Sequence, residues 1–341
     1  MVPFAGWEMP VQYASVIQEA KAVRDAAGMF DVSHMARLIL KGDRVLEYLE
    51  HITANDVSKL VDNTGQYSLL PNDRGGCVDD IIVYRLEEKK FAMVVNAANH
   101  EKDVAWMQKQ NSFGVEIKDE SLETSMIAVQ GPRAVPLLAE HSDSFEAITK
   151  APAFGVVQAQ IAGIDCMCCR SGYTGEDGYE LICLNEDASK LWHELLELGI
   201  VPCGLASRDT LRVEAGLPLY GHELGDDLSP LAAGLGWVVS KTKSFISSEF
   251  YNRDRNEGTS KKLQGIRLHS KRLITPGMKV YVGGSEVGEV TSGVFSVILD
   301  CGIAFAFVDS AIPLETPCEI DVRGKMEPGT LVNKRFFKRA K

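Results

Sequence analysis

Three apolar runs follow one another between residues 66 and 97, separated only by turn-forming or charged residues. They cover 66–71, 77–86 and 91–97, and the connections read PNDRGG and EEKK. Proline, asparagine, aspartate and glycine favour tight turns, and apolar runs bounded by such residues are typical of strands. We therefore expect a meander of three antiparallel strands here, closed by a helix at about 99–110. A further strand is predicted by RLILKG at 37–42.

A second group of the same kind follows. TSMIAVQGP predicts a strand that ends in a Gly-Pro turn, and RAVPLLAEH predicts a helix. Apolar runs near 154–161, 164–170 and 179–184 predict another meander, and EDASKLWHELLELG predicts a helix that ends at Gly199. Strands grouped with strands, with helices inserted between the groups, indicate an α+β fold with antiparallel sheets.

Two helix boundaries carry capping signals. Ser15 begins a Ser-x-x-Gln pattern with the spacing of a capping box, and Gly28 stands where a C-terminal cap is expected. The first helix is therefore predicted at about Val16–Ala27. Asp43 is expected to cap a short helix that reaches about His51.

The sequence pattern changes at about Lys261, after which short strand-like segments follow one another. KVYVGGSEVGEVTS contains a Gly-Gly-Ser hairpin turn, and GIAFAFV, CEIDVRG and GTLVNKRFF have the composition of strands. We expect an all-β module of about 80 residues. The preceding SSEFYNRDRNEG, which ends at Gly258, predicts a linking helix.

Charge and hydropathy exclude two classes of partner. The chain carries 47 acidic and 36 basic residues, a net charge of −11, which argues against a nucleic acid partner because phosphates are held mainly by clustered Lys and Arg. The one dense basic run, Asn333–Lys341, is interpreted as a solvated tail.

No window approaches the roughly 20 apolar residues of a membrane helix, and the N-terminus lacks an export signal. We expect no membrane association.

The eight cysteines form no regular framework, and CMCC at 166–169 lies in a strand-like run where successive side chains face opposite sides. No CxxC pair and no nearby histidine completes a tetrahedral set, so we expect reduced, buried thiols and no metal. The seven histidines show neither HxxxH nor HExxH spacing, and neither a GxSxG elbow nor a nucleotide-binding glycine motif is present.

Asp79 and Asp80 directly precede the apolar run Ile81–Tyr84. Neighbours on a strand face opposite sides, so these carboxylates cannot form a pair that shares a proton, and each needs its own explanation. A carboxylate beside an apolar sheet face must find donors or shift its pKa, which makes it either a structural acceptor or a poised base in a cleft. Spacing alone favours the structural role for both.

Glu180 and Arg208 are two further candidates. Glu180 alternates with apolar neighbours and is either a surface acid or a carboxylate that receives two parallel N–H donors. In GLASRDTLRVEAGLPLYGHEL, Ser207 is a plausible helix N-cap, Arg212 lies one turn after Arg208, and Gly216 ends the helix. An arginine in the first turn opposes the helix dipole, which hints at a ligand or an acidic partner.

Nine strings in order resemble the T-protein family of the glycine cleavage system, the tetrahydrofolate-dependent aminomethyltransferases, over essentially the whole chain. They are FAGWEMPVQY, AGMFDVSHM, YSLLPNDRGGCVDDIIVY, VVNAANHEKD, QGP, SGYTGEDGYEL, GLASRDTLRVEAGLPLYGHEL, GLGWVV and TSGVFS. The resemblance implies a three-domain fold around a central folate cavity: a discontinuous first domain (1–41 and 121–259), an inserted α/β second domain (42–120) and a C-terminal β-barrel (260–341).

The resemblance also implies roles for particular residues. Asp80 is the catalytic carboxylate, hydrogen-bonding folate N10 and helping to remove its proton. The folate-binding residues implied are Tyr67, Val95, Asn96, Tyr173, Glu180 and Arg208, with Lys338 for the glutamate tail. The implied reaction moves a one-carbon unit from the aminomethyl-lipoyl arm of H-protein to tetrahydrofolate, in a system that includes P-protein and L-protein. The implied location is the bacterial cytoplasm or the mitochondrial matrix.

Three positions depart from the family pattern: Ala36 and Val297 replace a common glycine and proline, and Arg335 precedes Phe336 in an unusual tail. We expect neither Ala36 nor Val297 to touch the chemistry. A KGCYxGQE-like string of iron–sulfur maintenance proteins is absent. A tetrahydrofolate-dependent demethylase and a non-catalytic folate-binding or H-protein-binding module stay open as alternatives.

Overall fold

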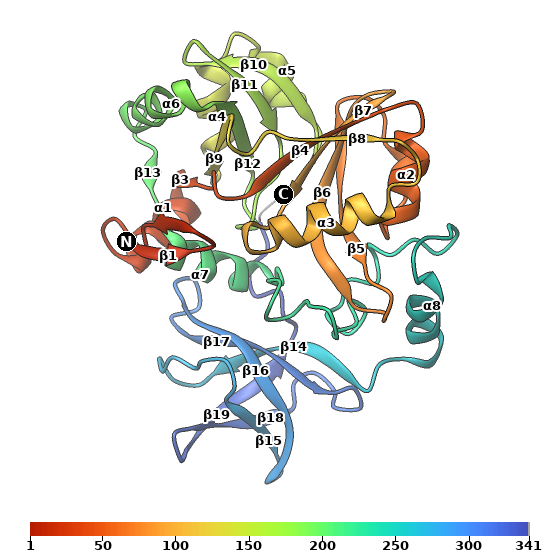
Figure 1. Ribbon diagram of the computed structural model, residues 1–341. Helices are drawn as coiled ribbons and strands as arrows, with labels where there is room; N and C mark the ends of the chain where they lie inside the picture. The colour runs from red at the N-terminus through yellow and green to blue at the C-terminus, as the bar shows by residue number, and fades with distance from the viewer. Residues whose placement is uncertain (340–341) are drawn as a thin grey trace.

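A computed structural model describes residues 1–339, which form two large sheets, a small two-stranded sheet and a barrel (Figure 1). The five-stranded sheet has the order β5-β6-β7-β4-β8. Its strands are β5 (Thr64–Pro71), β6 (Cys77–Glu87), β7 (Lys90–Val95), β4 (Ala36–Lys41) and β8 (Glu116–Asp119). The pairs β5–β6 and β6–β7 are antiparallel, so the predicted meander is confirmed.

Helices cover one face of this sheet. Apolar side chains of α2 (Val45–Ile52) and α3 (His100–Gln110) share one core with Ile81 and Val83 of β6. Two short 3-10 turns, η1 (Val57–Lys59) and η2 (Ala97–Asn99), complete this part of the chain. The other face of β6, with Ile82 and Tyr84, belongs to a second core shared with the six-stranded sheet.

The six-stranded sheet has the order β10-β11-β12-β9-β3-β13. Its strands are β10 (Val156–Ile161), β11 (Ile164–Cys169), β12 (Gly178–Leu184), β9 (Thr124–Gln130), β3 (Gly28–Asp31) and β13 (Val201–Pro202). One face packs against α4 (Ala134–Glu140), α5 (Phe145–Lys150) and α6 (Asn185–Glu197). The opposite face contributes to the core that contains Tyr84, α1 (Val16–Asp25) and α7 (Leu205–Ala215). The predicted second meander, β10-β11-β12, is confirmed.

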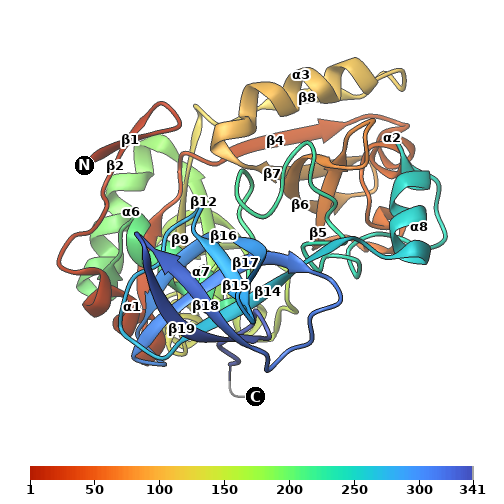
Figure 2. The same cartoon turned by 90° about the horizontal axis from the view of Figure 1, so that it is seen from below.

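The C-terminal strands close into the predicted β-barrel, with the order β14-β17-β16-β15-β18-β19. They are β14 (Lys261–Leu268), β15 (Lys279–Val282), β16 (Ser285–Ser296), β17 (Cys301–Asp309), β18 (Pro317–Val322) and β19 (Lys325–Val332). The linking helix α8 (Ser248–Glu257) ends at Gly258, as predicted. Figures 1 and 2 show α7 between the barrel and the sheets, so α7 joins the parts of the molecule.

The domain boundaries stay a prediction. Residues 36–41, which were assigned to the first domain, form β4 and pair with β7 and β8 inside the five-stranded sheet. The N-terminal hairpin of β1 (Val2–Phe4) and β2 (Trp7–Met9) forms a separate two-stranded sheet. All eight cysteines are free and buried, as expected. Among residues 1–339, no helix is long and apolar enough to cross a membrane.

Three predicted caps are wrong, and each has a physical reason. Gly28 begins β3 instead of capping α1, and a Cβ there would meet a side-chain atom of Val23 at 2.5 Å. Asp43 forms an ion pair with Lys89 at 2.7 Å and leaves α2 without a side-chain cap. Ser207 lies inside α7, whose N-cap is Gly204. The Ser15 cap of α1 is confirmed, since its hydroxyl accepts from the Gln18 N–H at 3.3 Å.

Candidate functional site

Asp79 and Asp80 face opposite sides of β6, as the strand alternation predicts. Asp79 is completely buried on the side of α2 and α3, and Asp80 is partly exposed on the side of the six-stranded sheet. The two acids therefore have different surroundings. Only Asp80 can reach a molecule bound between the sheets.

Asp80 is held by two side-chain donors. The Tyr67 hydroxyl donates to Oδ2 at 2.9 Å, and the Asn96 amide donates to Oδ1 at 2.9 Å. Burial, followed by the charge of Asp79, raises the pKa of the Asp80 carboxyl to about 7, although both donors act in the opposite direction. A carboxyl group that titrates near neutral pH can take up and release a proton under working conditions.

Asn96 connects the two aspartates, a role that the sequence did not reveal. Its Nδ2 donates to Asp79 Oδ1 at 2.9 Å as well as to Asp80 Oδ1, and its backbone N–H donates to Asp79 Oδ2 at 2.9 Å. The backbone N–H is therefore engaged within the protein and is not free for a ligand. Val95 is buried at the end of β7, directly opposite Ala36 of β4.

Glu180 is buried on β12 and belongs to a short relay of hydroxyl groups. The Tyr84 hydroxyl donates to Ser171 at 2.8 Å, and the Ser171 hydroxyl donates to Glu180 Oε2 at 2.5 Å. Burial raises the pKa of the Glu180 carboxyl. Within residues 1–339, no hydrogen bond reaches the other oxygen, Oε1, which leaves it available to a donor from a ligand.

Two arginines one turn apart on α7 have opposite surroundings. Arg212 is 1% exposed and donates to Asp209 at 2.8 Å, Glu223 at 3.0 Å and Ser292 at 2.7 Å. Arg208, in contrast, has a buried Nη1 atom without a hydrogen-bond partner among the described residues. A buried donor without an acceptor is costly, and a ligand carrying an acceptor would satisfy it. Arg212 is thus a structural residue and Arg208 a binding candidate.

Tyr173 lies near both Asp80 and Arg208. The Arg208 guanidinium lies 5.0 Å from the centre of its ring, and the charges of both Arg208 and Asp80 act on its hydroxyl. Its hydroxyl donates to the carbonyl of Pro218, which orients the ring. Tyr67 bonds Asp80, and the charge of Arg208 acts on Glu180. These contacts join one continuous neighbourhood of five residues: Tyr67, Asp80, Tyr173, Arg208 and Glu180.

Trp237 is an aromatic neighbour that the sequence analysis did not single out as a site residue. Its ring stacks on Tyr67 with centroids 6.2 Å apart and is 70% exposed. An exposed indole over a tyrosine that bonds Asp80 is a surface on which a flat ring can stack. The only sequence feature that pointed to Trp237 was the family-like string GLGWVV, which contains it.

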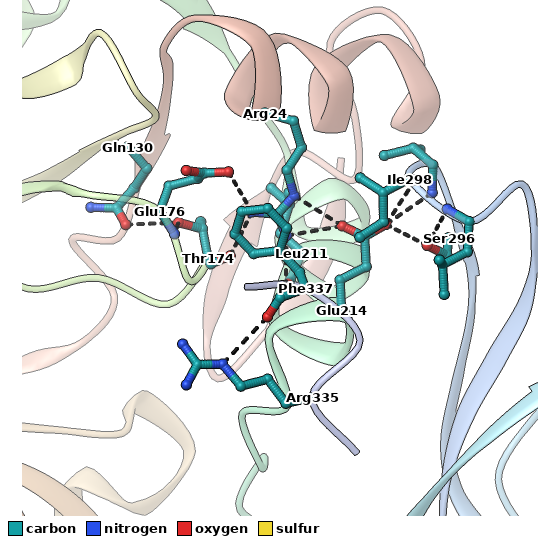
Figure 3. A network of polar contacts seen from close by, with 12 residues as sticks. Arg24, Gln130, Thr174, Glu176, Leu211, Glu214, Ser296, Ile298, Arg335 and Phe337 are labelled. Carbon is teal, nitrogen blue, oxygen red and sulfur yellow. Dashed lines mark hydrogen bonds and ion pairs between the residues drawn. The ribbon is translucent and has the colours of Figure 1, made fainter. Parts of the chain in front are cut away.

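An ion-pair network fixes the loop that carries Tyr173 (Figure 3). Arg24 pairs with Glu176 of this loop and with Glu214 of α7, each at 2.9 Å. Glu214 also accepts from Ser296 at 2.7 Å and from the backbone N–H of Val297 at 2.9 Å, both in the barrel region. A proline at position 297 could not donate this bond. The Val297 N–H thus adds a donor to the network around Glu214.

The C-terminal segment completes the frame around the site, so its interpretation as a solvated tail is wrong for residues 334–337, which pack against the rest of the chain. The Phe337 ring packs against the Arg24 guanidinium, 3.8 Å from its centroid (Figure 3). Lys338, predicted to meet a folate tail, is exposed, and that role stays a prediction. Lys334 is the more buried lysine: its Nζ donates to the Ala233 carbonyl at 2.6 Å, and burial lowers its pKa to about 8.

Hollows lie beside Arg208 and on the barrel. One of about 10 Å³ borders Arg208 and has room for one water molecule at most. Another of about 360 Å³ lies on the barrel, beside Arg267 and His269, and shares no residue with the site. A central folate cavity stays a prediction. No group of three or more acidic, histidine or cysteine side chains in the described range could hold a metal ion.

Comparisons with known proteins cover the whole chain. Residues 1–243 match the GCVT N-terminal domain, and residues 261–338 match the glycine cleavage T-protein C-terminal barrel domain. An aminomethyltransferase of Deinococcus deserti is 44% identical, covering 99% of this chain and 93% of that protein. One of Geobacillus sp. (strain WCH70) is 41% identical, covering 100% and 95%. The crystal structure of glycine cleavage system aminomethyltransferase T from Bartonella henselae superposes with a TM-score of 0.91 at 32% identity, covering 99% of this chain and 94% of that chain.

Proposed function

We infer the function from one premise: the chain belongs to the glycine cleavage T-protein family. It is an aminomethyltransferase of the glycine cleavage system, and the family implies use of folate. We propose that the folate is tetrahydrofolate and that the donor is the aminomethyl group on the lipoyl arm of H-protein. The products are 5,10-methylenetetrahydrofolate, ammonia and the dihydrolipoyl arm, which accounts for every atom of the two reactants.

We propose that Asp80 is the catalytic carboxylate. In its ionised form it can accept the proton that the attacking nitrogen loses, and its negative charge favours the cationic character that develops on the transferred carbon. Tyr67 and Asn96 hold its two oxygens, so the carboxylate is oriented before the substrates bind. A pKa raised to about 7 keeps it able to accept and release a proton near neutral pH.

Glu180 and Arg208 are proposed to hold the pterin. A pterin presents adjacent amino and ring N–H donors, and Glu180 has one oxygen engaged by Ser171 and one free of hydrogen bonds within the described chain. The unpartnered Nη1 of Arg208 can donate to a pterin acceptor. Tyr67 and Tyr173 supply aromatic contact. Val95 and Lys338 are proposed as further folate contacts. For Asn96 such a contact would compete with the bond that its N–H already makes to Asp79.

One observation carries the proposal. A partly exposed carboxyl group with a pKa near neutrality lies in one neighbourhood with an unpartnered arginine donor and a carboxylate that has a free oxygen. The buried, unpartnered Arg208 donor is unfavourable for stability without a ligand, and the three features together match the donors and acceptors of a reduced pterin.

Ammonia release from aminomethyl-loaded H-protein tests the proposal directly. An aminomethyltransferase releases ammonia rapidly only when tetrahydrofolate is present. Failure to release ammonia, combined with folate binding, would favour a non-catalytic folate-binding protein. Release of a methyl group from a small methylated amine to tetrahydrofolate would favour the demethylase. The partner proposal places H-protein in direct contact, with P-protein and L-protein acting in the same system, and the bacterial relatives support a cytoplasmic location.

A further inference from the structure

A second buried acid lies behind the site. Asp103, on α3, is completely buried, and neither of its carboxyl oxygens has a hydrogen-bond donor among the residues of the described chain. An ionised carboxylate in such a place would be without compensation. Nothing in the reaction proposed above uses this residue.

Asp103 lies one helical turn after Asn99, whose amide donates to Asp79 Oδ1 at 2.5 Å, so the two fully buried carboxyl groups are neighbours, and Asp79 acts on the pKa of Asp103 through both its charge and a side-chain hydrogen bond. Asp79 is itself fully buried, and its oxygens accept from the Asn96 N–H at 2.9 Å, the Asn96 amide at 2.9 Å and the Asn99 amide at 2.5 Å. These donors stabilise a negative charge on Asp79. Two buried carboxylates in contact repel each other, whereas a carboxylic acid beside a carboxylate forms a strong hydrogen bond.

Lys102 compensates a charge on Asp103 only in part. Lys102 is the cation whose charge acts on it, and its Nζ already donates to the Tyr220 hydroxyl at 2.7 Å. The Tyr220 hydroxyl in turn donates to the carbonyl of Cys77 at 3.2 Å. Asp80 contributes only further negative charge. Burial, followed by the charge of Asp79, raises the pKa of the Asp103 carboxyl to about 11.

Asn96 links this pair to the catalytic carboxylate. The same Nδ2 atom donates to Asp79 Oδ1 and to Asp80 Oδ1, each at 2.9 Å. The position and charge of Asp79 therefore govern how firmly Asn96 holds Asp80. The charge of Asp79 is also the largest electrostatic influence on Asp80 after burial.

We propose that Asp103 is a protonated acid that donates its O–H to Asp79, and that this shared proton fixes Asn96 and, through it, the catalytic Asp80. Asp103 is thus a positioning residue: it touches no substrate. The hydrogen bond draws negative charge on Asp79 toward Asp103 and away from Asp80. The effect on turnover rests on the proposed function of Asp80, but the protonation of Asp103 does not.

Infrared spectroscopy of the protein without folate tests the protonation. A protonated carboxyl group absorbs at a different infrared frequency from a carboxylate. The wild-type protein should therefore show one carboxyl band, from Asp103, that persists to alkaline pH. A second carboxyl band, from Asp80, should disappear as the pH rises through about 7. Asp103→Asn should remove the persistent band and leave the titrating band. Asp79→Asn should make the persistent band titrate at lower pH, because Asp103 loses its anionic partner. Glu101→Gln, an exposed acid on the same helix, is the matched control and should change neither band.

Turnover supplies an independent readout. Asp103→Asn keeps an N–H donor toward Asp79, so its turnover and pH profile should stay close to wild type. Asp103→Leu removes the donor and should lower turnover roughly 10-fold and shift the acid limb of the profile to higher pH. Absence of the persistent band in the wild type, or its survival in Asp103→Asn, would overturn the proposal and leave the role of Asp80 untouched. Loss of turnover in Asp103→Asn with a normal fold would also overturn it.

Discussion

Arg208 and Arg212 lie on successive turns of α7, and replacing each by methionine should have opposite effects. Arg212 forms a buried ion pair with Glu223 at 3.0 Å, and both side chains are almost inaccessible. Removing one partner of such a pair leaves an uncompensated buried charge, which costs about 3–5 kcal/mol of unfolding free energy. Arg208 has an unpartnered Nη1, so Arg208→Met should change stability by only about 1 kcal/mol.

Folate binding should show the reverse order. A hydrogen bond from a charged donor contributes about 1.5–3 kcal/mol, so Arg208→Met should weaken tetrahydrofolate binding roughly 10- to 150-fold. Urea unfolding and anaerobic calorimetry, applied to both variants, measure the two quantities. Equal destabilisation by the two substitutions, with unchanged folate affinity in Arg208→Met, would refute the assignment of Arg208 as the ligand-facing arginine.

Three further predictions concern the site and its frame. Glu180→Gln should weaken tetrahydrofolate binding roughly 10- to 100-fold, measured by calorimetry, because a carboxylate acceptor is lost; unchanged affinity would remove Glu180 from the pterin site. Turnover should rise as the pH passes upward through about 7, since only ionised Asp80 accepts a proton, and Asp79→Asn should move the midpoint to lower pH; an unchanged midpoint would contradict this. Val297→Pro should cost about 1 kcal/mol by removing an N–H donor to Glu214, whereas Val297→Ala, which keeps it, should match the wild type in thermal unfolding.

Much of the fold follows from local patterns. The two meanders and the barrel strands are visible as apolar runs bounded by turn residues, because alternation and turn chemistry are properties of short segments. β8 (Glu116–Asp119) was missed, since EIKD is a polar edge strand with no apolar run. The position of β3 between β9 and β13 depends on contacts between distant segments, which local periodicity does not encode.

The wrong N-cap prediction for α7 shows what a local sequence pattern cannot reveal. Ser207 follows the expected N-cap pattern, but α7 starts earlier because Glu19 accepts the Gly204 N–H at 2.9 Å. This contact joins residues far apart in the chain. The observation that Arg208 opposes the helix dipole still holds, since Arg208 lies in the first turns of α7.

The candidate site was only partly accessible from the sequence. The opposite orientation of Asp79 and Asp80 follows from the strand period, but spacing gave both a structural role, and only burial and partners separate them. Asp103 gave no signal, because an acid in a helix is usually solvated and its burial arises from the packing of α3 on β6. The bridging amide of Asn96 was missed for the same reason, since its partners belong to a neighbouring strand.

The catalytic role of Asp80 is tested most directly by Asp80→Asn, assayed for single-turnover ammonia release and for tetrahydrofolate affinity in the same preparation. The amide cannot accept the proton but preserves the shape of the side chain, so the rate should fall roughly 10²- to 10⁴-fold. Folate affinity should stay nearly unchanged, because the proposed pterin contacts of Glu180 and Arg208 remain. Wild-type turnover in this variant would contradict the account.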